Sequence, residues 1–527
     1  MSLDWNNPYS SSHSPVFADN IVSTSQPLAT SAGLAILAAG GNAVDAAIAT
    51  AICLTVVEPN NNGIGSDAFA IIWDGDRLHG LNASGRSPSG WSPSFFSQYE
   101  QMPQQGWNAV TVPGAVSAWV EMSERFGVLP FEKLFDRAIE YAAKGYQVGP
   151  KTGYYWKFAE RQFKNFPDFN KTFLPHGKAP AIGTRVVLAD HAQTLRKIAV
   201  SKGRAFYEGE LAELMVADST RHGGVLCMDD LANHSADWVD TISTRLGEDE
   251  LHEIPPNGQG LMALIATGIA NQLGLGKLSP DSAESIHFQI EATRIAYTII
   301  ERELADIASM QVKLDSLLNE AFFCQQADLI DPTQARVRQT NIGAAPDTVY
   351  LTTADKSGMM VSMIQSNFRG FGSGIVVPNT GISLQNRGSG FSLESGHPNQ
   401  VGGNKRPYHT IIPGFVMSNN QPKMSFGVMG GHMQAQGHLQ MMIRVAQHGQ
   451  NPQTASDAPR WYLQENGTIC LEDGFATDVI ESLKARGHTI IENNPEHLFG
   501  GAQLIYRLAD GYCAGSDHRK EGQAAGF

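Results

Sequence analysis

Cysteine is scarce in this sequence, and its few copies lie far apart. They are odd in number and none forms a Cys-x-x-Cys pair: Cys53, Cys227, Cys324, Cys470 and Cys513. This spacing argues against a disulfide framework and against a zinc site. We therefore expect a reducing, cytoplasmic setting.

Runs of basic residues and long apolar segments are also missing. The formal net charge is -14, and without a cluster of Lys and Arg we expect neither nucleic acid nor a membrane as a partner. The N-terminal stretch MSLDWNNPYSSSHSPVFADN has no apolar core behind a basic region, so no secretory signal is expected. The longest apolar stretch, residues 43–57, is shorter than a membrane span and carries Asp45. We expect it to be a core helix.

The sequence does have the size and the patterning of a large folded enzyme. Its 527 residues are 42% hydrophobic, enough for an extensive core. Helical spacing of apolar residues dominates up to about residue 307, with Asn42 as the expected N-cap of the helix at residues 43–57 and FAIIWDGDRLHGL as two strands joined by an Asp-Gly-Asp turn. Short strands and turns become frequent after Asp347, among helices such as Gly437 to His448. The order predicts an α+β fold in which sheet layers are covered by helices.

Several familiar catalytic signatures are absent. There is no Gly-x-Ser-x-Gly, no His-Glu-x-x-His and no Gly-x-x-x-x-Gly-Lys. GIGSDA at residues 63–68 fits a loose dinucleotide pattern, but it leads into a predicted strand, whereas that fingerprint must open a helix. His432 and His438 lie six apart and cannot share a helix face as zinc ligands do. We expect no metal and no organic cofactor.

The segment Asp347-Thr348 opens a predicted strand hairpin, and alone it would be unremarkable because Thr is a common strand former. Its surroundings give it meaning. The chain resembles the γ-glutamyltransferase family over nearly its whole length, through AGLAILAAGGNAVDAAIA, VEPNNNGIGSDAF, VPGAVSAW, GGVLCMDDL, IPPNGQG, DTVYLTTADKSG, GFGSGIVVPNTGISLQN, GGNKRP and GVMGGH, in the order of the family.

The resemblance implies a self-cleaving N-terminal-nucleophile hydrolase with a four-layer αββα sandwich. The family's precursors cut themselves before the Thr that matches Thr348, so cleavage at Asp347-Thr348 would give a large chain, residues 1–347, and a small chain, residues 348–527. Both would remain one intertwined globular unit. The freed α-amine, with an unperturbed pKa near 8, can accept the hydroxyl proton, so one residue would be both nucleophile and base.

The resemblance also implies the supporting groups. Ser366 matches a hydroxyl that hydrogen-bonds the catalytic Thr, and Gly430 and Gly431 match the pair whose amides form the oxyanion hole. Glycine suits this task because backbone amides must come close to the developing oxyanion.

The chain departs from true γ-glutamyl enzymes where they bind the α-amino group. Gly390 stands in the place of their acidic residue, with Arg387 and Asn386 close by in LQNRGSGFS. Arg can clamp a carboxylate with a two-pronged guanidinium, so the substrate is expected to carry a carboxylate and to lack the amino group.

Two further departures reshape the predicted pocket. His409 and Thr410 replace the paired serines after Lys-Arg-Pro, and the loop SLESGHPNQVGG is short compared with the lid of bacterial transferases. Arg86 lies near the family's α-carboxylate arginine without being in register with it. An ordinary surface ion pair remains the alternative for Arg86 and Arg387.

These departures are similar to the acylase-like branch of the family, which includes glutaryl acylases and oxamate amidohydrolases. They predict hydrolysis of a small carboxylate-bearing amide, with oxamate giving oxalate and ammonia as the first choice. A glutaryl-type acylase and a γ-glutamyl hydrolase or transferase stay open, as does an uncleaved, non-catalytic binding protein. The expected partners are the small-molecule amide and the two chains of one precursor, and a homo-oligomer of that heterodimer is left open.

Overall fold

The structure is a computed structural model, and it describes residues 13–336 and 348–527. Two seven-stranded sheets form its centre. The first sheet has, in spatial order, β1 (Val16–Ala18), β18 (Tyr512–Ser516), β17 (Gly501–Arg507), β13 (Gln421–Met429), β12 (Gly414–Ser418), β9 (Asp249–Glu253) and β8 (Ile242–Leu246). The second has β19 (Gln523–Gly526), β2 (Ile21–Thr24), β10 (Val349–Ala354), β11 (Met360–Ser366), β3 (Asp67–Trp73), β4 (Leu78–Ala83) and β7 (Asp237–Val239).

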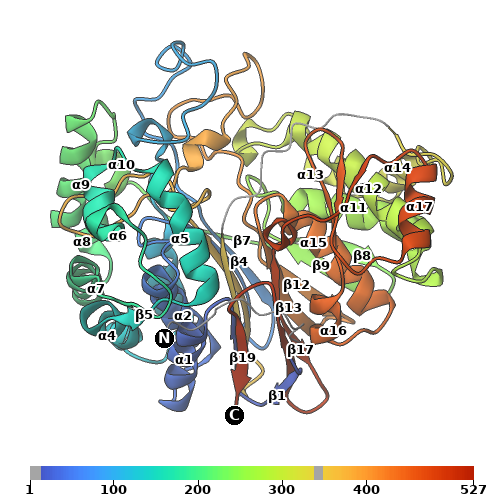
Figure 1. Ribbon diagram of the computed structural model, residues 1–527, viewed down its shortest axis with the longest axis horizontal. Coiled ribbons are helices and arrows are strands. Elements are labelled where there is room, and N and C mark those ends of the chain that lie inside the picture. Colours follow the sequence, from blue (N-terminus) through green and yellow to red (C-terminus); the bar gives the residue numbers. More distant parts are fainter. Residues whose placement is uncertain (1–12, 337–347) are drawn as a thin grey trace.

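The two sheets face each other across a shared apolar core. Alternate residues of β3, β10 and β11 in the second sheet pack with alternate residues of β12, β13 and β17 in the first, Phe69 and Tyr350 with Phe415 and Ile505 among them. The period of two in a strand sends the remaining side chains to the outer faces, where the helices lie. Figure 1 shows the strands at the centre with helices to either side.

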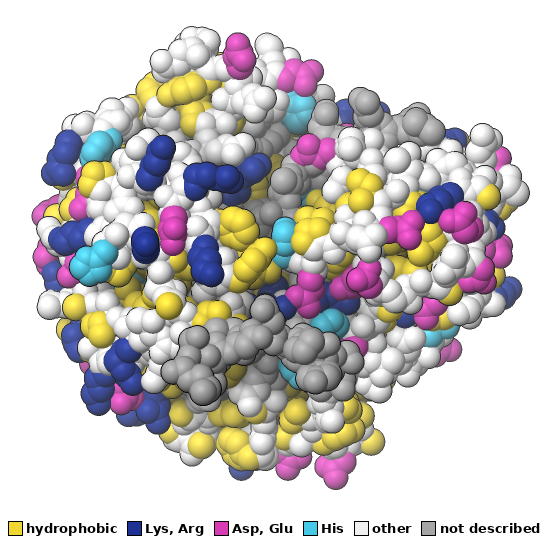
Figure 2. All heavy atoms as spheres, in the orientation of Figure 1, with side chains coloured by type: hydrophobic (Ala, Val, Ile, Leu, Met, Phe, Trp, Pro, Cys, Tyr) yellow, Lys and Arg dark blue, Asp and Glu magenta, His cyan; other side chains and the backbone are white. Residues whose placement is uncertain are grey.

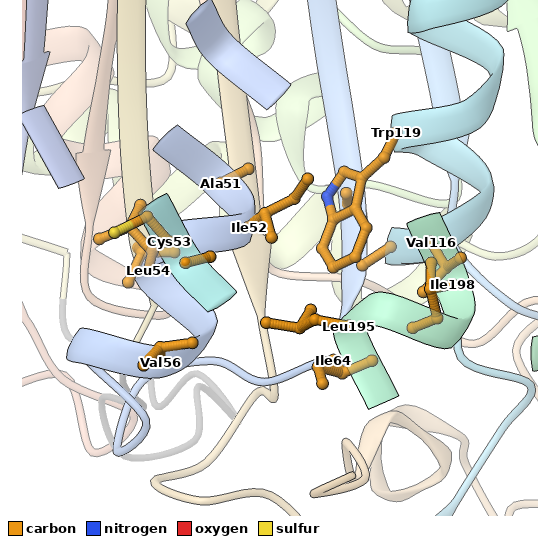
Figure 3. Close-up of a cluster of buried hydrophobic side chains, with 14 of the residues drawn as sticks. Ala51, Ile52, Cys53, Leu54, Val56, Ile64, Val116, Trp119, Leu195 and Ile198 are labelled. Carbon is orange, nitrogen blue, oxygen red and sulfur yellow. The ribbon is translucent and has the colours of Figure 1, made fainter. Parts of the chain in front are cut away.

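Helices from the first part of the chain cover the outer face of the second sheet. They are α1 (Pro27–Ala38), α2 (Ala43–Val57), α3 (Ala115–Phe126), α4 (Asp136–Lys144), α5 (Pro150–Gln162), α6 (Pro167–Phe173), α7 (Ala189–Ser201), α8 (Arg204–Tyr207), α9 (Glu210–Arg221) and α10 (Met228–Ala232). Figure 3 shows part of their core, where α2 meets Trp119 of α3 and Leu195 of α7.

The predicted core helix at residues 43–57 is confirmed. Asn42 caps α2 by accepting from the Asp45 amide, and the Asp45 carboxylate accepts in return from the Asn42 amide. This reciprocal pair satisfies amides that the first turn of a helix leaves open. All residues of α2 are buried, so the helix serves as the centre of this helical layer.

A second group of helices covers the outer face of the first sheet. They are α11 (Gly260–Gln272), α12 (Ala283–Glu303), α13 (Leu314–Leu317), α14 (Glu320–Ala327), α15 (Met433–Met442), α16 (Pro452–Asp457) and α17 (Thr477–Ala485). Two smaller sheets complete the fold, one of β14 (Trp461–Leu463), β15 (Ile469–Leu471) and β16 (Ile490–Ile491), the other of β5 (Tyr146–Gln147) and β6 (Arg185–Val186).

The helix expected from Gly437 to His448 begins earlier than its sequence pattern indicates. α15 starts at Met433, and a wider helical turn follows at Ile443–Gln447. The carbonyls of Gly430 and Gly431 accept from the amides of Met433 and Gln434, so the helix starts directly after this turn. Gly437 lets this helix pack closely against β13, because a Cβ at this position would lie 2.6 Å from a Val428 methyl group.

Strands from both sides of residue 347 alternate within the sheets. β10 and β11 lie between β2 and β3, and β19 closes the edge beside β2. The two segments that self-cleavage would separate therefore hydrogen-bond to each other through three strand pairs of the second sheet, β2–β10, β3–β11 and β2–β19. Removing either one would leave unpaired strand edges.

The surface and the cysteines agree with the composition. All five cysteines are free. Among the described residues no helix combines the length and the apolar character needed to cross a bilayer. In Figure 2, Lys and Arg gather over the helices on the left, whereas Asp and Glu are more frequent on the right.

Candidate active site

Three polar residues form one row across the second sheet. Val349 pairs with Gln365, which sets Thr348 opposite Ser366 at the ends of β10 and β11, and Ser366 in turn pairs with Asp67 of β3. Directly paired residues of antiparallel strands share a face. Because alternate residues Tyr350 and Ile364 belong to the core between the sheets, the row also faces that space.

Thr348 is held by two side chains. Its hydroxyl donates to Ser366 Oγ at 3.2 Å, and Gln434 Nε2 of α15 donates to Thr348 Oγ1 at 3.4 Å. The Gln434 carbonyl oxygen accepts from the Ile412 amide at 3.0 Å, which fixes the orientation of this side chain. Thr348 is 1% exposed. The other half of the predicted cleavage site, Asp347, lies outside the described residues.

Gly430 and Gly431 form the turn between β13 and α15. Their φ angles are +119° and +59°, a region that favours glycine. A Cβ on Gly430 would come 2.9 Å from the Gly500 Cα, so a larger residue would push two backbone segments apart. Gln259 Nε2 donates to the Gly431 carbonyl at 2.8 Å. The turn thus lies between the first sheet and the helix whose Gln434 contacts the nucleophile.

The segment after Ser366 connects the Thr348–Ser366 pair with Arg387. The Phe368 amide donates to Ser366 Oγ at 2.8 Å, and the Phe368 ring lies under the Arg387 guanidinium at 4.5 Å from its centroid. Phe368 has a φ of +77°, which costs a bulky residue about 1–3 kcal/mol and persists only where the surroundings enforce it. Such strain is typical of functional sites.

Arg387 is a buried cation without an ion pair. It lies in a short 3₁₀ turn, Arg387–Gly390, and its Nη1 donates to Thr410 Oγ1 at 2.8 Å. Its Nε and Nη2 have no hydrogen-bond partner within the described chain. Burial lowers the pKa of Arg387 to about 9, with the Asp67 carboxylate opposing that shift. These groups can receive an anion.

His409 and Asp67 form a fully buried pair beneath this cation. His409 Nε2 and Asp67 Oδ2 lie 3.1 Å apart, and Asp67 Oδ1 accepts from the amides of Gly85 and Gly114 at 3.2 and 3.0 Å. Burial raises the pKa of Asp67 to about 7, although Arg387 and the amides act in the opposite direction. Burial, with Arg387 adding to it, holds the pKa of His409 well below its usual value.

The remaining predicted substrate residues have partners of their own. Asn386 Oδ1 accepts from the Arg369 amide at 3.1 Å, and its Nδ2 donates to the Gln104 carbonyl at 2.8 Å. Arg86 has a side chain that is 44% exposed and pairs with Asp306 at 3.1 Å and Asp237 at 3.7 Å. The structure therefore brings together Thr348, Ser366, the glycine pair, Arg387, His409 and Thr410, and it leaves Arg86 in a surface ion pair.

An open cavity of about 610 Å³ lies beside this group. Its wall includes Ser389 and Gly390, which follow Arg387, together with Tyr408, which precedes His409, and His432, which follows Gly431. The rings of Tyr408 and His432 are stacked at 13°. The cavity therefore adjoins the segments that carry Arg387, His409 and Gly431.

One group of residues has the composition of a metal site, at some distance in the fold from this group. The potential ligand atoms of His287, Glu291 and His488 lie within 4.8 Å of one another. Two nitrogens sharing a tetrahedral zinc ion would be roughly 3.4 Å apart, but His287 Nδ1 and His488 Nε2 are at 2.8 Å, a hydrogen bond. Glu291 already accepts from Arg294 and from the Arg336 amide. The contacts fit a hydrogen-bonded cluster better than a metal centre.

Comparison with known proteins decides the family. A family model described as gamma-glutamyltranspeptidase matches residues 29–527. The chain belongs to the γ-glutamyltranspeptidase family. Curated relatives from this family include the oxamate amidohydrolase proenzyme of Klebsiella pneumoniae, 32% identical with 95% of this chain and 97% of that protein covered. The glutathione hydrolase-like YwrD proenzyme of Bacillus subtilis is 31% identical with the same coverage.

A solved structure from the family is similar throughout. The cephalosporin acylase from Bacillus halodurans has a TM-score of 0.95 at 43% identity, covering 100% of this chain and 99% of that chain. The family members act on amide C–N bonds and are made as proenzymes, so the predictions of a self-processing amide hydrolase and of the family are confirmed. This result sets aside the alternative of a non-catalytic binding protein.

Four residues of this group were not predicted from the sequence: Asp67, Gln259, Phe368 and Gln434. Asp67 belongs to GIGSDA, which was weighed as a nucleotide site and counted within the family motif VEPNNNGIGSDAF, without a role for Asp67 itself. The register that places Asp67 beside Ser366 depends on pairing between β3 and β11, which are far apart in the sequence. A buried acid at the start of an apolar strand was the one available signal.

Proposed function

We propose that the protein hydrolyses amides whose acyl half carries a carboxylate, with Arg387 as the carboxylate anchor. The observation behind this proposal is a guanidinium that is 1% exposed, has no ion pair among the described residues and keeps two nitrogen positions without partners. Each hydrogen bond from such a cation to an anion contributes about 1.5–3 kcal/mol. A substrate carboxylate would satisfy both positions.

In the proposed mechanism Thr348 is nucleophile and base. After cleavage its α-amine accepts the Oγ1 proton while Oγ1 attacks the amide carbonyl. The amides of Gly430 and Gly431 donate to the oxyanion, and Ser366 with Gln434 keeps Oγ1 in place. The tetrahedral intermediate collapses when the leaving amine takes up a proton, and water then hydrolyses the acyl-enzyme on the same base.

The proposed maturation cut lies between Asp347 and Thr348. It would yield the large chain 1–347 and the small chain 348–527, and the alternation of their strands in the second sheet supports one intertwined unit after cleavage. The shared core between two sheets and the helices outside them support a four-layer αββα sandwich of the N-terminal-nucleophile type. A cytoplasmic location is part of the proposal and rests on the cysteine usage.

Oxamate is the proposed substrate, giving oxalate and ammonia. Its carboxylate is bonded directly to the amide carbonyl carbon, so this substrate needs a carboxylate anchor close to the proposed nucleophile. Phe368 connects the two, because its amide donates to Ser366 Oγ and its ring lies under the Arg387 guanidinium. The 32% identical relative from Klebsiella pneumoniae is named for this activity.

A glutaryl-type amide is the second candidate, and the cavity favours it. A space of about 610 Å³ is far larger than ammonia needs, so a bulky leaving amine would fit. The 43% identical neighbour is named as a cephalosporin acylase. A γ-glutamyl substrate is less favoured, because Gly390 stands in the place of the acid that binds the amino group in γ-glutamyl enzymes, and the acids of the cavity wall, Glu100, Glu301 and Glu394, come from other positions.

The experiment compares a series of amides that differ only in the length of the spacer between the amide and the carboxylate. Ammonia release by the cleaved enzyme would be measured for oxamate, malonamate, succinamate and glutaramate. We expect kcat/KM to be highest for oxamate. A maximum at glutaramate would select the second candidate, and rapid hydrolysis of a γ-glutamyl anilide would contradict both.

Two arginine variants test whether Arg387 binds the carboxylate of these substrates. Arg387→Met should lower kcat/KM for the best substrate of the series by roughly 10²-fold, because about two charge-assisted hydrogen bonds are lost. Arg86→Gln is the matched control, since it removes an arginine that pairs with Asp306 and Asp237. Equal losses in the two variants, or none in Arg387→Met, would refute the anchor.

A further inference from the structure

A second carboxylate, Asp67, shares Arg387 with the proposed acyl site. Asp67 and His409 are both 0% exposed, and Thr410, the next residue after His409, accepts from Arg387 Nη1. Of the charges acting on Asp67, the Arg387 guanidinium is the strongest. Asp67 also stands in the row with Ser366 and Thr348. A substrate carboxylate bound to Arg387 would therefore lie near the carboxylate of Asp67.

The hydrogen bonds of His409 define how this pair holds its protons. The Ile411 amide donates to His409 Nδ1 at 3.4 Å, so in the neutral ring the proton is on Nε2 and is donated to Asp67 Oδ2 at 3.1 Å. The pair then carries one negative charge, which balances Arg387. A further proton has two acceptors within the pair, the Asp67 carboxylate and His409 Nδ1.

We propose that Asp67 determines the specificity of the acyl site by coupling the binding of a carboxylate at Arg387 to uptake of one proton by the Asp67–His409 pair. The inference rests on the proposed function, because it takes Arg387 as the carboxylate anchor. Without the proton, a buried site would hold two negative charges against one positive charge. With it, the total returns to zero, and burial penalises any other balance.

The surroundings of Asp67 set the pH range of this effect. The charged or titratable groups that interact with the Asp67 carboxylate are Arg387, Arg406 and His409, together with Tyr207 of α8. Burial raises the pKa of Asp67 to about 7, so above that pH the free enzyme must take a proton from solvent when the carboxylate binds. Affinity for carboxylate-bearing acyl groups should thus fall as the pH rises, by up to about tenfold per unit.

The first test is calorimetry on the cleaved wild-type enzyme with propionate and butyrate, each of which brings one carboxylate, as the candidate substrates do. Binding heats at pH 8 in two buffers of different ionisation enthalpy give the number of protons taken up. We expect about one proton per site. Binding without proton uptake would overturn the inference.

Two variants separate this coupling from a general effect of buried acids. Asp67→Asn keeps an oxygen for the Gly85 and Gly114 amides and should abolish the uptake. Glu253→Gln is the matched control, because Glu253 and His438 form another fully buried pair, at 2.6 Å. Its uptake should equal that of the wild type. If Asp67→Asn does not fold, the wild-type calorimetry still decides.

The second test follows KM with pH for two substrates of equal length, one ending in a carboxylate and one in a methyl group. KM for the carboxylate amide should rise above pH 7 in the wild type and stay level in Asp67→Asn, while kcat keeps one profile in both. The methyl amide should show no such rise. A level KM for the carboxylate amide in the wild type overturns the inference alone; absence of hydrolysis of every carboxylate amide overturns the proposed function instead.

Discussion

The proposed nucleophile and the proposed carboxylate anchor are built on different kinds of backbone. Thr348 and Ser366 end two paired strands, β10 and β11, inside a seven-stranded sheet. Arg387 and Thr410 lie on irregular segments that are held by side-chain contacts such as the Phe368 ring. The strands fix the reacting atoms through many backbone hydrogen bonds, whereas the anchor depends on a few side chains.

From this difference we expect the paired strands to carry the chemistry and the irregular segments around Arg387 to select the substrate. Relatives named as amidohydrolase, acylase and glutathione hydrolase share this fold and family. Loops can be replaced without disturbing a sheet. We therefore expect changes at Thr348 and Ser366 to abolish the reaction on every substrate, and changes around Arg387 to alter the choice among substrates.

The largest effect is expected at Thr348. Thr348→Ala removes the attacking oxygen and should lower hydrolysis of every amide by roughly 10³-fold or more. Thr348→Ser keeps the hydroxyl and should retain measurable activity in a steady-state ammonia assay. Equal activity of wild type and Thr348→Ala in freshly purified protein would contradict the nucleophile.

The next largest effect is expected at the glycine turn. Gly430→Ala places a Cβ against Gly500 and moves the proposed oxyanion donors, so kcat should fall roughly 10²-fold. Gly449→Ala is the control, since Gly449 also has a positive φ, +61°, but open space around it. It should show a similar loss of thermal stability with unchanged kcat. Equal kcat values for the two variants would remove the turn from the mechanism.

A smaller and more selective effect is expected under Arg387. Phe368→Gly accepts the φ of +77° but removes the ring from the guanidinium. KM for carboxylate amides should rise by about fivefold, in the range of a partly desolvated cation–π contact, with less change for a methyl-ended amide. An equal loss on both substrates would show that Phe368 supports the reaction itself, as Thr348 and Ser366 do, and not the choice of substrate.

The smallest effect is expected at Arg86. Arg86→Gln breaks an exposed ion pair with Asp306 that contributes at most about 1 kcal/mol. The kcat/KM for carboxylate amides should stay within about twofold of the wild type. A loss as large as that of Arg387→Met would show that both arginines belong to the acyl site.

Local patterns predicted much of the fold. Asn42 as the cap of α2, the hairpin of β3 and β4 and the hairpin after Thr348 each depend on neighbouring residues, and each is found in the structure. The start of α15 was missed because it depends on the turn at Gly430 and Gly431 rather than on periodicity.

The site was predictable only where the family motifs reach. Thr348 and Ser366 lie together as expected. The Asp67–His409 pair was not predictable, because it joins residues 342 positions apart whose contact depends on strand register and on an irregular loop. His409 was expected to face the substrate, and the structure instead gives its Nε2 to Asp67. Arg86 shows the reverse case, because it lies near the family's α-carboxylate arginine in the sequence but pairs with the buried Asp306 and the partly exposed Asp237 in the structure.

Intact-mass analysis of freshly purified wild type beside Thr348→Ala tests whether Thr348 becomes an N-terminal catalytic residue. We expect two fragments from the wild type, one ending at Asp347 and one beginning at Thr348, and a single chain of 57.0 kDa from the variant. A wild type that stays at full mass while releasing ammonia from its substrate would contradict an N-terminal threonine as the catalytic group.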